Sequence, residues 1–325
     1  MNKLIKSIAC ASLILSASAC SMNKTTTVSN GDEVFFSVGN TKVTKSDVYQ
    51  YMKLQNLDTG IIAMAEEDLI NELVPVTDEM NQKVDELIAA DKELYGEDTF
   101  LQMITYYGFE DEQAYRDAYL INMRMTELTH DYIETNWDSL IDTYKPIKAN
   151  VLSFVDNANS NESSESTEEG EETTESQAQI NANEALTALK DGSKDLETII
   201  NDYELTANVE PTIYLNNNQT LPTAVLTYLQ TNQLGYCNEV IFDDSTGTPT
   251  YYVINIVEND ANNMKDDVLT SLSSVSDVAV SADQDLLRSH NFFVYDQMVL
   301  EALRANYNGY LTDKQQAPTQ TAASE

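Results

Sequence analysis

Histidine and cysteine are scarce in this sequence, with two histidines and three cysteines among 325 residues. His130 and His290 lie far apart in the chain, and no two cysteines have the spacing of a zinc site. The patterns H-E-x-x-H, G-x-S-x-G and the phosphate-binding P-loop are absent as well. These absences exclude the common zinc, serine-hydrolase and nucleotide-dependent enzymes, and we expect neither a metal nor any other cofactor.

Basic residues are also few: 18 Lys and Arg stand against 54 Asp and Glu, which gives a formal net charge of −36. The phosphate backbone of a nucleic acid would repel such a chain, so we expect no nucleic-acid partner. Seven glutamates fall in the run "ESSESTEEGEETTES", which has no hydrophobic side chain. A segment of this composition buries too little apolar surface to offset its chain entropy, and we expect residues 156–178 to be a disordered acidic insertion.

The amino terminus has the order of a secretory signal peptide, with Lys3 and Lys6 before the apolar run "IACASLILSASA". The run is too short to span a bilayer. The letters "ASAC" fit a lipobox ending at Cys20, although they also fit an ordinary signal-peptidase site. We favour the lipobox because a polar Ser/Thr/Asn stretch follows the cysteine. Residues 1–19 are then the signal peptide, and residues 20–33 are the lipid anchor, acylated at Cys20, and a polar tether.

Beyond the tether, the sequence predicts a largely helical region over residues 34–146. An apolar strand, 34–38, is followed by a capping box between Thr44 and Asp47 at the start of a helix. Strong helical periodicity continues, with a break near Gly108 and one long helix towards Tyr144, which Pro146 ends.

Residues 147–257 alternate strand and helix patterns. The strand-like "KANVLSF" precedes the acidic insertion, and two amphipathic helices broken at Asp191-Gly192 follow it. Then come "PTIYL", the short helical "LPTAVLTYLQ", and two strands around a Gly/Pro turn. After this domain we expect C-terminal helices over 258–310, including a single helix in "ADQDLLRSHNFFVYDQMVLEALRANYN", and a disordered tail over 311–325. The fold class is therefore α+β.

The amino-terminal half resembles the chaperone region of PrsA-type foldases and their SurA-like relatives. The similar segments are "FFSVGNTKVTKSDVYQY", "VTDEMNQKVDEL" and "YGEDTFLQMITYYGFEDEQAYRDAY". The resemblance implies a helical SurA-like lobe at 34–146, an inserted parvulin-like rotamase domain at 147–257, and C-terminal helices that return to the lobe.

Parvulin-type prolyl isomerases build their pocket around two hydrogen-bonded histidines. In this chain we place those positions at Asn150 and Tyr252, so the imidazole pair is missing. We therefore expect no strong isomerase activity. An active isomerase is the alternative, because twisting a prolyl bond requires no proton transfer.

The resemblance implies an extracytoplasmic, lipid-anchored folding factor on the outer face of the cell membrane of a Gram-positive-like bacterium. Its partners would be unfolded or partly folded secreted proteins. Met and Tyr are dense in the helical region and can accept varied apolar segments; packing in the core is the better explanation for each of them singly, yet we expect some to line an open groove. A surface binding or adhesion lipoprotein on the same scaffold is another alternative. The candidate client-binding residues are Tyr49, Met52, Met103, Tyr106, Tyr107 and Met123.

Overall fold

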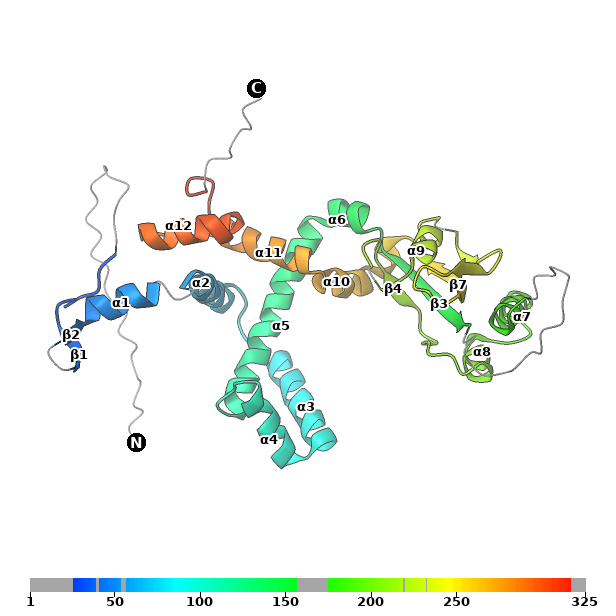
Figure 1. The fold of residues 1–325 in the computed structure, drawn as a ribbon, viewed down its shortest axis with the longest axis horizontal. Helices are drawn as coiled ribbons and strands as arrows, with labels where there is room; N and C mark the ends of the chain where they lie inside the picture. The colour runs from blue at the N-terminus through cyan, green and yellow to red at the C-terminus, as the bar shows by residue number, and fades with distance from the viewer. Residues whose placement is uncertain are drawn as a thin grey trace, which may run out of the picture. The chain divides into compact units, whose positions relative to one another are not determined.

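A computed structural model describes residues 26–38, 41–53, 57–156, 175–218, 220–231 and 233–316 (Figure 1). The signal peptide, Cys20 and most of the acidic insertion lie outside these residues. The chain divides into two compact units, which are described separately below. Unit 1 contains the residues up to Tyr132 and those from Ser276 onward, and unit 2 contains Ile133–Val275. Among the described residues, every helix is too short or too polar to cross a membrane.

Unit 1 is mainly helical and is built from both ends of the chain. A two-stranded antiparallel hairpin opens it, and helices follow. Its elements are β1 (Val34–Val38), β2 (Thr41–Thr44), α1 (Lys45–Lys53), α2 (Leu57–Leu73), α3 (Asp78–Tyr95), α4 (Glu97–Tyr106), α5 (Glu112–Thr135), α11 (Ser276–Ser289), α12 (Gln297–Asn306) and the 3-10 helix η2 (Asn308–Tyr310). The division between the units falls near the end of α5.

Local signals set several of these boundaries. Asp47 Oδ2 accepts from the Thr44 backbone N–H at 2.8 Å, and Thr44 Oγ1 accepts from the Asp47 N–H at 3.2 Å, which confirms the predicted capping box before α1. Thr77 caps α3 by accepting from the Met80 N–H. Gly96 ends α3 at a φ of +79°, a conformation that residues with a side chain rarely adopt.

At least two hydrophobic cores within the described residues stabilise unit 1. Helices α3, α4 and α5 share the first, in which Val84 and Phe100 are fully buried. The second joins α2 to the C-terminal helices, with Leu287, Leu303 and Leu311 fully buried. In Figure 1 the blue α2 accordingly lies beside the red α12.

A buried ion pair adds a polar link between the chain ends in unit 1. Lys53 Nζ lies 2.9 Å from Asp296 Oδ2, and the two side chains are 0% and 7% exposed. The same Asp296 oxygen accepts from the backbone N–H and the hydroxyl of Thr26. Its other oxygen, Oδ1, accepts from the N–H groups of Met298 and Val299 and so caps α12.

Unit 2 contains a five-stranded antiparallel sheet with helices around it. The sheet has the order β4-β3-β7-β5, and β6 also pairs with β7. Its core includes Leu152 and Phe154 from β3 and Ile254 and Ile256 from β7. The elements are α6 (Trp137–Tyr144), β3 (Ile147–Val155), α7 (Gln177–Asp191), α8 (Leu196–Asp202), β4 (Thr212–Tyr214), α9 (Thr223–Leu229), β5 (Gly235–Tyr236), β6 (Ile241–Asp243), β7 (Thr250–Glu258), the 3-10 helix η1 (Ala261–Met264) and α10 (Lys265–Ser273).

The helices and strands together give an α+β fold, as predicted. However, each of two long helices that the sequence predicted is divided into two in the structure. The helix expected to reach Tyr144 is divided at Asn136 into α5 and α6. The single C-terminal helix is divided into α11 and α12, with Asn291 at a φ of +60° after the first and Asp296 capping the second. Both breaks occur at Asn or Asp, residues that favour helix ends over helix interiors.

Three predicted boundaries also differ from the structure. Residues 311–316, expected in a disordered tail, are packed in unit 1: Leu311 is fully buried, and the Gln315 side chain bonds the N–H and the carbonyl of Val294. Residues 177 and 178, expected in the disordered insertion, begin α7, because Ser176 caps that helix. Helix α10, expected to return to the chaperone lobe, belongs to unit 2, where Lys265 pairs with Glu134 and Lys148 pairs with Asp267.

Candidate functional site

The two predicted pocket positions, Asn150 and Tyr252, lie on neighbouring strands of unit 2 but on opposite faces of the sheet. In the β3–β7 register, Asn150 stands opposite Asn255 and Ser153 stands opposite Tyr252. Residues directly opposite in an antiparallel pair share a face, and successive residues alternate between faces. Asn150 and Tyr252 therefore do not form one hydrogen-bonded pair.

Asn150 has a structural role on its face of the sheet. Its side chain is buried, and Nδ2 donates to the carbonyl of Val209 at 2.9 Å. Leu152, Phe154 and Tyr251 share this face, and the Tyr251 hydroxyl donates to Gln179 of α7 at 3.5 Å. The amide thus holds the backbone at Val209 beside this strand.

Tyr252 lies on the other face, with Val151, Ser153 and Ile254. It is half-buried, and burial raises the pKa of its hydroxyl, which stays protonated at neutral pH. The β3 side chains beside it are one aliphatic chain and one hydroxyl, neither of which can replace an imidazole. Both histidines belong to unit 1, so the pair of imidazoles that a parvulin uses is missing from unit 2.

Neither Cys237 nor the adjacent pair of Ser289 and His290 has the arrangement of a catalytic group. Cys237 is fully buried, and burial raises the pKa of its thiol, which makes it unreactive. Ser289 Oγ lies 3.1 Å from His290 Nδ1, but both atoms also bond the Leu286 carbonyl at the exposed end of α11. Within the described residues, no three His, Cys, Asp or Glu side chains cluster as metal ligands would.

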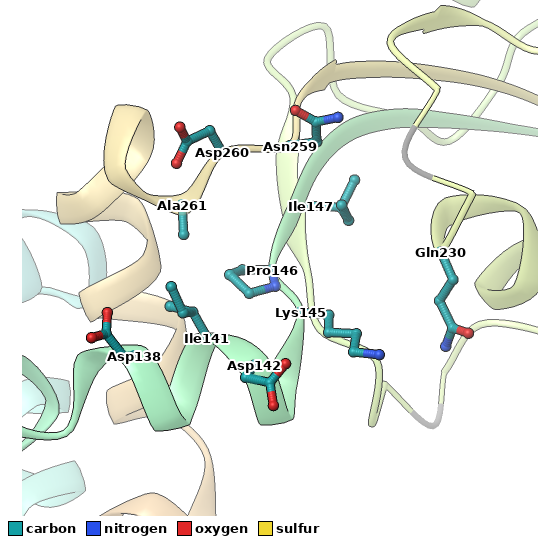
Figure 2. Close-up of a pocket in the computed structure, with 10 residues that line it drawn as sticks. All are labelled: Asp138, Ile141, Asp142, Lys145, Pro146, Ile147, Gln230, Asn259, Asp260 and Ala261. Atoms are coloured by element: carbon teal, nitrogen blue, oxygen red, sulfur yellow. The ribbon is translucent and has the colours of Figure 1, made fainter.

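A cleft of about 660 Å³ lies in unit 2 between α6 and the segment after β7 (Figure 2). Figure 2 shows Asp138 and Asp142 on α6, with Asp260 and Ala261 opposite them. Ile141, Pro146 and Ile147 supply an apolar part of the lining. Asp260 Oδ1 accepts from the backbone N–H and the side chain of Asn262, so this carboxylate caps η1. The lining carries three carboxylates, those of Asp138, Asp142 and Asp260, and one cation, Lys145.

The six candidate client-binding residues fall into two classes in unit 1. Three are strongly exposed: Tyr106 (86%), Tyr107 (67%) and Met52 (54%). The other three are half-buried: Met103 and Met123 pack against the core of α3, α4 and α5, and Tyr49 bonds Thr26 and lies against Lys53. The six residues therefore do not form one surface.

A further set of exposed apolar side chains lies on α3, α4 and the turn after α4, and we call this set the hairpin surface. Tyr106 and Tyr107 meet edge to face, with ring centroids 5.5 Å apart. Sequence reasoning named these two but missed the other members, although the spacing of Leu87 and Leu94 by seven residues, which places both on one side of α3, could have indicated two of them. The members of the hairpin surface are Leu87, Leu94, Tyr95, Leu101, Tyr106 and Tyr107, all at least 42% exposed.

Comparison with known proteins gives likenesses at the level of structure alone. No family model and no curated protein matches the chain. The foldase protein PrsA from Streptococcus pneumoniae is similar at 16% identity and a TM-score of 0.45, covering 83% of this chain and 98% of its own. The PrsA peptidylprolyl isomerase from Bacillus cereus is similar at 14% identity and a TM-score of 0.42, covering 85% and 98%.

A third similar structure comes from a study of the SurA-like chaperones PEB4 and Cj1289 of Campylobacter jejuni. It matches at 13% identity and a TM-score of 0.22, covering 82% of this chain and 93% of its own. The identities and TM-scores are all low, so these likenesses carry no functional argument.

Proposed function

We propose that this protein is an extracytoplasmic folding factor that binds unfolded secreted polypeptides through its helical unit. The observation that carries the proposal is the hairpin surface, where Tyr106, Tyr107 and Leu94 are 86%, 67% and 72% exposed. Exposed apolar side chains gathered on one part of a protein are typical of an interaction site. The sequence resemblance to PrsA-type and SurA-like chaperone regions points to the same activity.

The chemistry of the hairpin surface suits weak binding of many sequences. Tyrosine offers a flat apolar ring with a polar edge, and leucine accepts apolar contacts without directional bonds. Acidic residues flank these side chains, including Asp91 and Glu93 on α3 and Asp98 on α4. Together with the net charge of −36, they would keep a protein with exposed apolar groups soluble and monomeric.

We further propose that unit 2 has no strong prolyl isomerase activity. Isomerisation catalysed by a parvulin pocket requires groups placed around the twisting amide, and Tyr252 shares its face with Val151 and Ser153 rather than with a histidine. In this proposal unit 2 is a parvulin-like domain that has kept a sheet but lost the pocket chemistry.

The site of action in this proposal is the outer face of the cell membrane. The signal-peptide pattern and the "ASAC" sequence support acylation at Cys20. Both lie outside the described residues. An anchored protein would meet its clients as they emerge from the membrane.

The test of the proposal is suppression of aggregation of an unfolded secretory protein by the purified protein. The triple variant Leu94→Ser, Tyr106→Ser, Tyr107→Ser should lose at least half of the protection. The control is the double variant Val209→Ser, Val257→Ser. It also replaces exposed apolar side chains by serine, but both valines are in unit 2, where they are 47% and 46% exposed. Equal protection by the triple variant and the parent would contradict the placement on the hairpin surface. A dedicated adhesion lipoprotein would give no protection in any form.

A further inference from the structure

Another pocket, of about 500 Å³, lies in unit 1. Its lining residues come from the C-terminal part of the chain, whereas the hairpin surface is formed by α3, α4 and the turn after α4. The pocket forms where the end of α11, the segment between α11 and α12, and the residues after η2 meet. Its volume falls in the usual range for small-ligand sites. The lining residues are Arg288, Asn291, Phe293, Tyr295, Thr312, Asp313 and Lys314.

The net charge of this pocket has the opposite sign to the net charge of the chain. Acidic residues outnumber basic ones 54 to 18, so a lysine or arginine would be expected to have a carboxylate partner. Nine ion pairs involve eight of the 15 lysines and arginines in the described part of the chain. Arg288 and Lys314 take part in none of them, and within the described part of the chain neither side chain has a recorded hydrogen bond. Only Asp313 adds a carboxylate to the lining. The lining therefore carries two cations and one carboxylate, a net charge of +1.

Two aromatic rings are held beside these cations in a fixed arrangement. The Gln315 side chain accepts from the Val294 N–H at 2.8 Å and donates to the Val294 carbonyl at 2.6 Å, so it holds that residue as a neighbouring strand would. Val294 is buried, while Phe293 and Tyr295 are 44% and 61% exposed on either side of it. Their ring centroids lie 5.0 Å apart. The rings are thus presented outward at little further entropic cost.

A polar atom at the same place lacks a partner. The Thr312 hydroxyl is buried and has no hydrogen-bond partner among the described residues. An unpaired buried hydroxyl is unfavourable, so a ligand group that reached it and bonded it would favour binding.

We propose that this pocket binds a short acidic polypeptide segment in which an aromatic or large apolar side chain stands next to a carboxylate. The Arg288 guanidinium and the Lys314 ammonium would bond the carboxylate, and the rings of Phe293 and Tyr295 would pack on the apolar side chain. This site goes beyond the proposed function, because it selects a charge and a side-chain type, whereas the hairpin surface binds apolar segments of any charge.

The test measures binding of acetyl-Glu-Phe-Asp-amide to the purified protein by calorimetry and by ligand-observed NMR. The neutral peptide acetyl-Gln-Phe-Asn-amide should bind at least 10-fold more weakly than the acidic one. The double variant Arg288→Gln, Lys314→Gln and the single variant Tyr295→Ala should each weaken binding of the acidic peptide at least 10-fold. Lys42→Gln is the matched control, because Lys42 is an exposed lysine on β2 that has no ion pair among the described residues. It should leave binding unchanged.

The three changes are at partly or fully exposed side chains, and circular dichroism would verify the fold of each variant. Equal binding of the two peptides, or unchanged binding in the double variant, would overturn the proposal. Poly(glycerol phosphate) is the competing anionic probe. If it binds more tightly than the peptide through Arg288 and Lys314 and is insensitive to Tyr295→Ala, the pocket recognises a phosphate polymer and the assignment to a peptide is wrong.

Discussion

Replacing Asp296 by alanine should destabilise unit 1 severely and leave unit 2 unaffected. Five donors bond this carboxylate: the N–H and hydroxyl of Thr26, the ammonium of Lys53, and the N–H groups of Met298 and Val299. The variant loses the cap of α12 and leaves the Lys53 ammonium, whose side chain is fully buried, without a counter-ion. Breaking a buried ion pair from one side costs about 3–5 kcal/mol. Loss of a cap costs about 1 kcal/mol, which overlaps with the first figure because the same carboxylate is removed.

The pKa of Asp296 gives an independent measure of the same interaction. Burial opposes ionisation, but the hydrogen bonds from Thr26 and Lys53 outweigh it, and the pKa falls from 3.8 to about 2. At 1.36 kcal/mol per unit, the ionised group contributes about 2 kcal/mol. This stability is present above the unfolded pKa and is lost as the pH falls through about 2. We therefore expect a loss of about 3–4 kcal/mol at neutral pH, against a typical domain stability of about 5–15 kcal/mol.

The assay can separate the two units because Trp137, the single tryptophan, lies in unit 2. In urea, tryptophan fluorescence follows unit 2, while far-ultraviolet circular dichroism also follows the helices of unit 1. Asp296→Ala should lower the midpoint of the dichroism change and leave the fluorescence midpoint in place. Lys53→Met, the matched control, should cost less, because four of the five donors to Asp296 remain. A loss below about 1 kcal/mol, or an equal shift of both probes, would refute the reasoning.

Three further predictions follow from other parts of the chain. Burial and the nearby Asp283 raise the pKa of Glu66 to about 7, and burial raises the pKa of Asp283 to about 6. With respect to these two groups, unit 1 should therefore be most stable below about pH 4.5. It should lose stability as the pH rises through 6 to 7. Glu66→Gln should remove about 1–2 kcal/mol of that dependence in urea titrations at pH 5 and 8, after allowance for partial exposure; equal pH dependence in the variant would contradict this. In a peptide prolyl isomerase assay the protein should give no rate above background, and an acceleration lost in Tyr252→Ala with the fold intact would show a working pocket. Cys20→Ala should appear in the culture medium, and an unmodified Cys20 in the intact mass of the wild type would disprove the anchor.

Sequence patterns predicted the local features of this fold well. The Thr44 and Asp47 capping box and the helix break at Gly192, which has a φ of +73°, both depend on residues close to one another in the chain. The break between α11 and α12 was missed because part of its cause is distant: Gln315 satisfies the backbone of Val294 from 21 residues away. No helical periodicity carries that information.

The candidate site was predicted less well because it, too, depends on contacts between residues that are distant in the sequence. A shift of one residue in strand position moves a side chain to the other face of a sheet, and sequence patterns did not indicate that Asn150 and Tyr252 lie on opposite faces. Met103 and Tyr106 belong to the same helix, yet Met103 packs inward and Tyr106 faces solvent. Which side of α4 meets α3 and α5 is decided by packing between helices, so composition alone could not separate these two residues.

The hydrogen bond between Thr26 and Asp296 joins residues 270 positions apart, and it has a consequence for the order of synthesis and folding. Unit 2 is one continuous stretch, so it can fold as soon as Val275 has emerged, whereas unit 1 must wait for α11 and α12. Until then α2 exposes an apolar face that only the last helices cover. The entropy of closing a loop grows with the logarithm of its flexible length, so prior folding of unit 2 shortens the loop that unit 1 must close. Newly made molecules would therefore pass through a state with one finished unit and one unfinished unit, and slow export of the last 50 residues would prolong it.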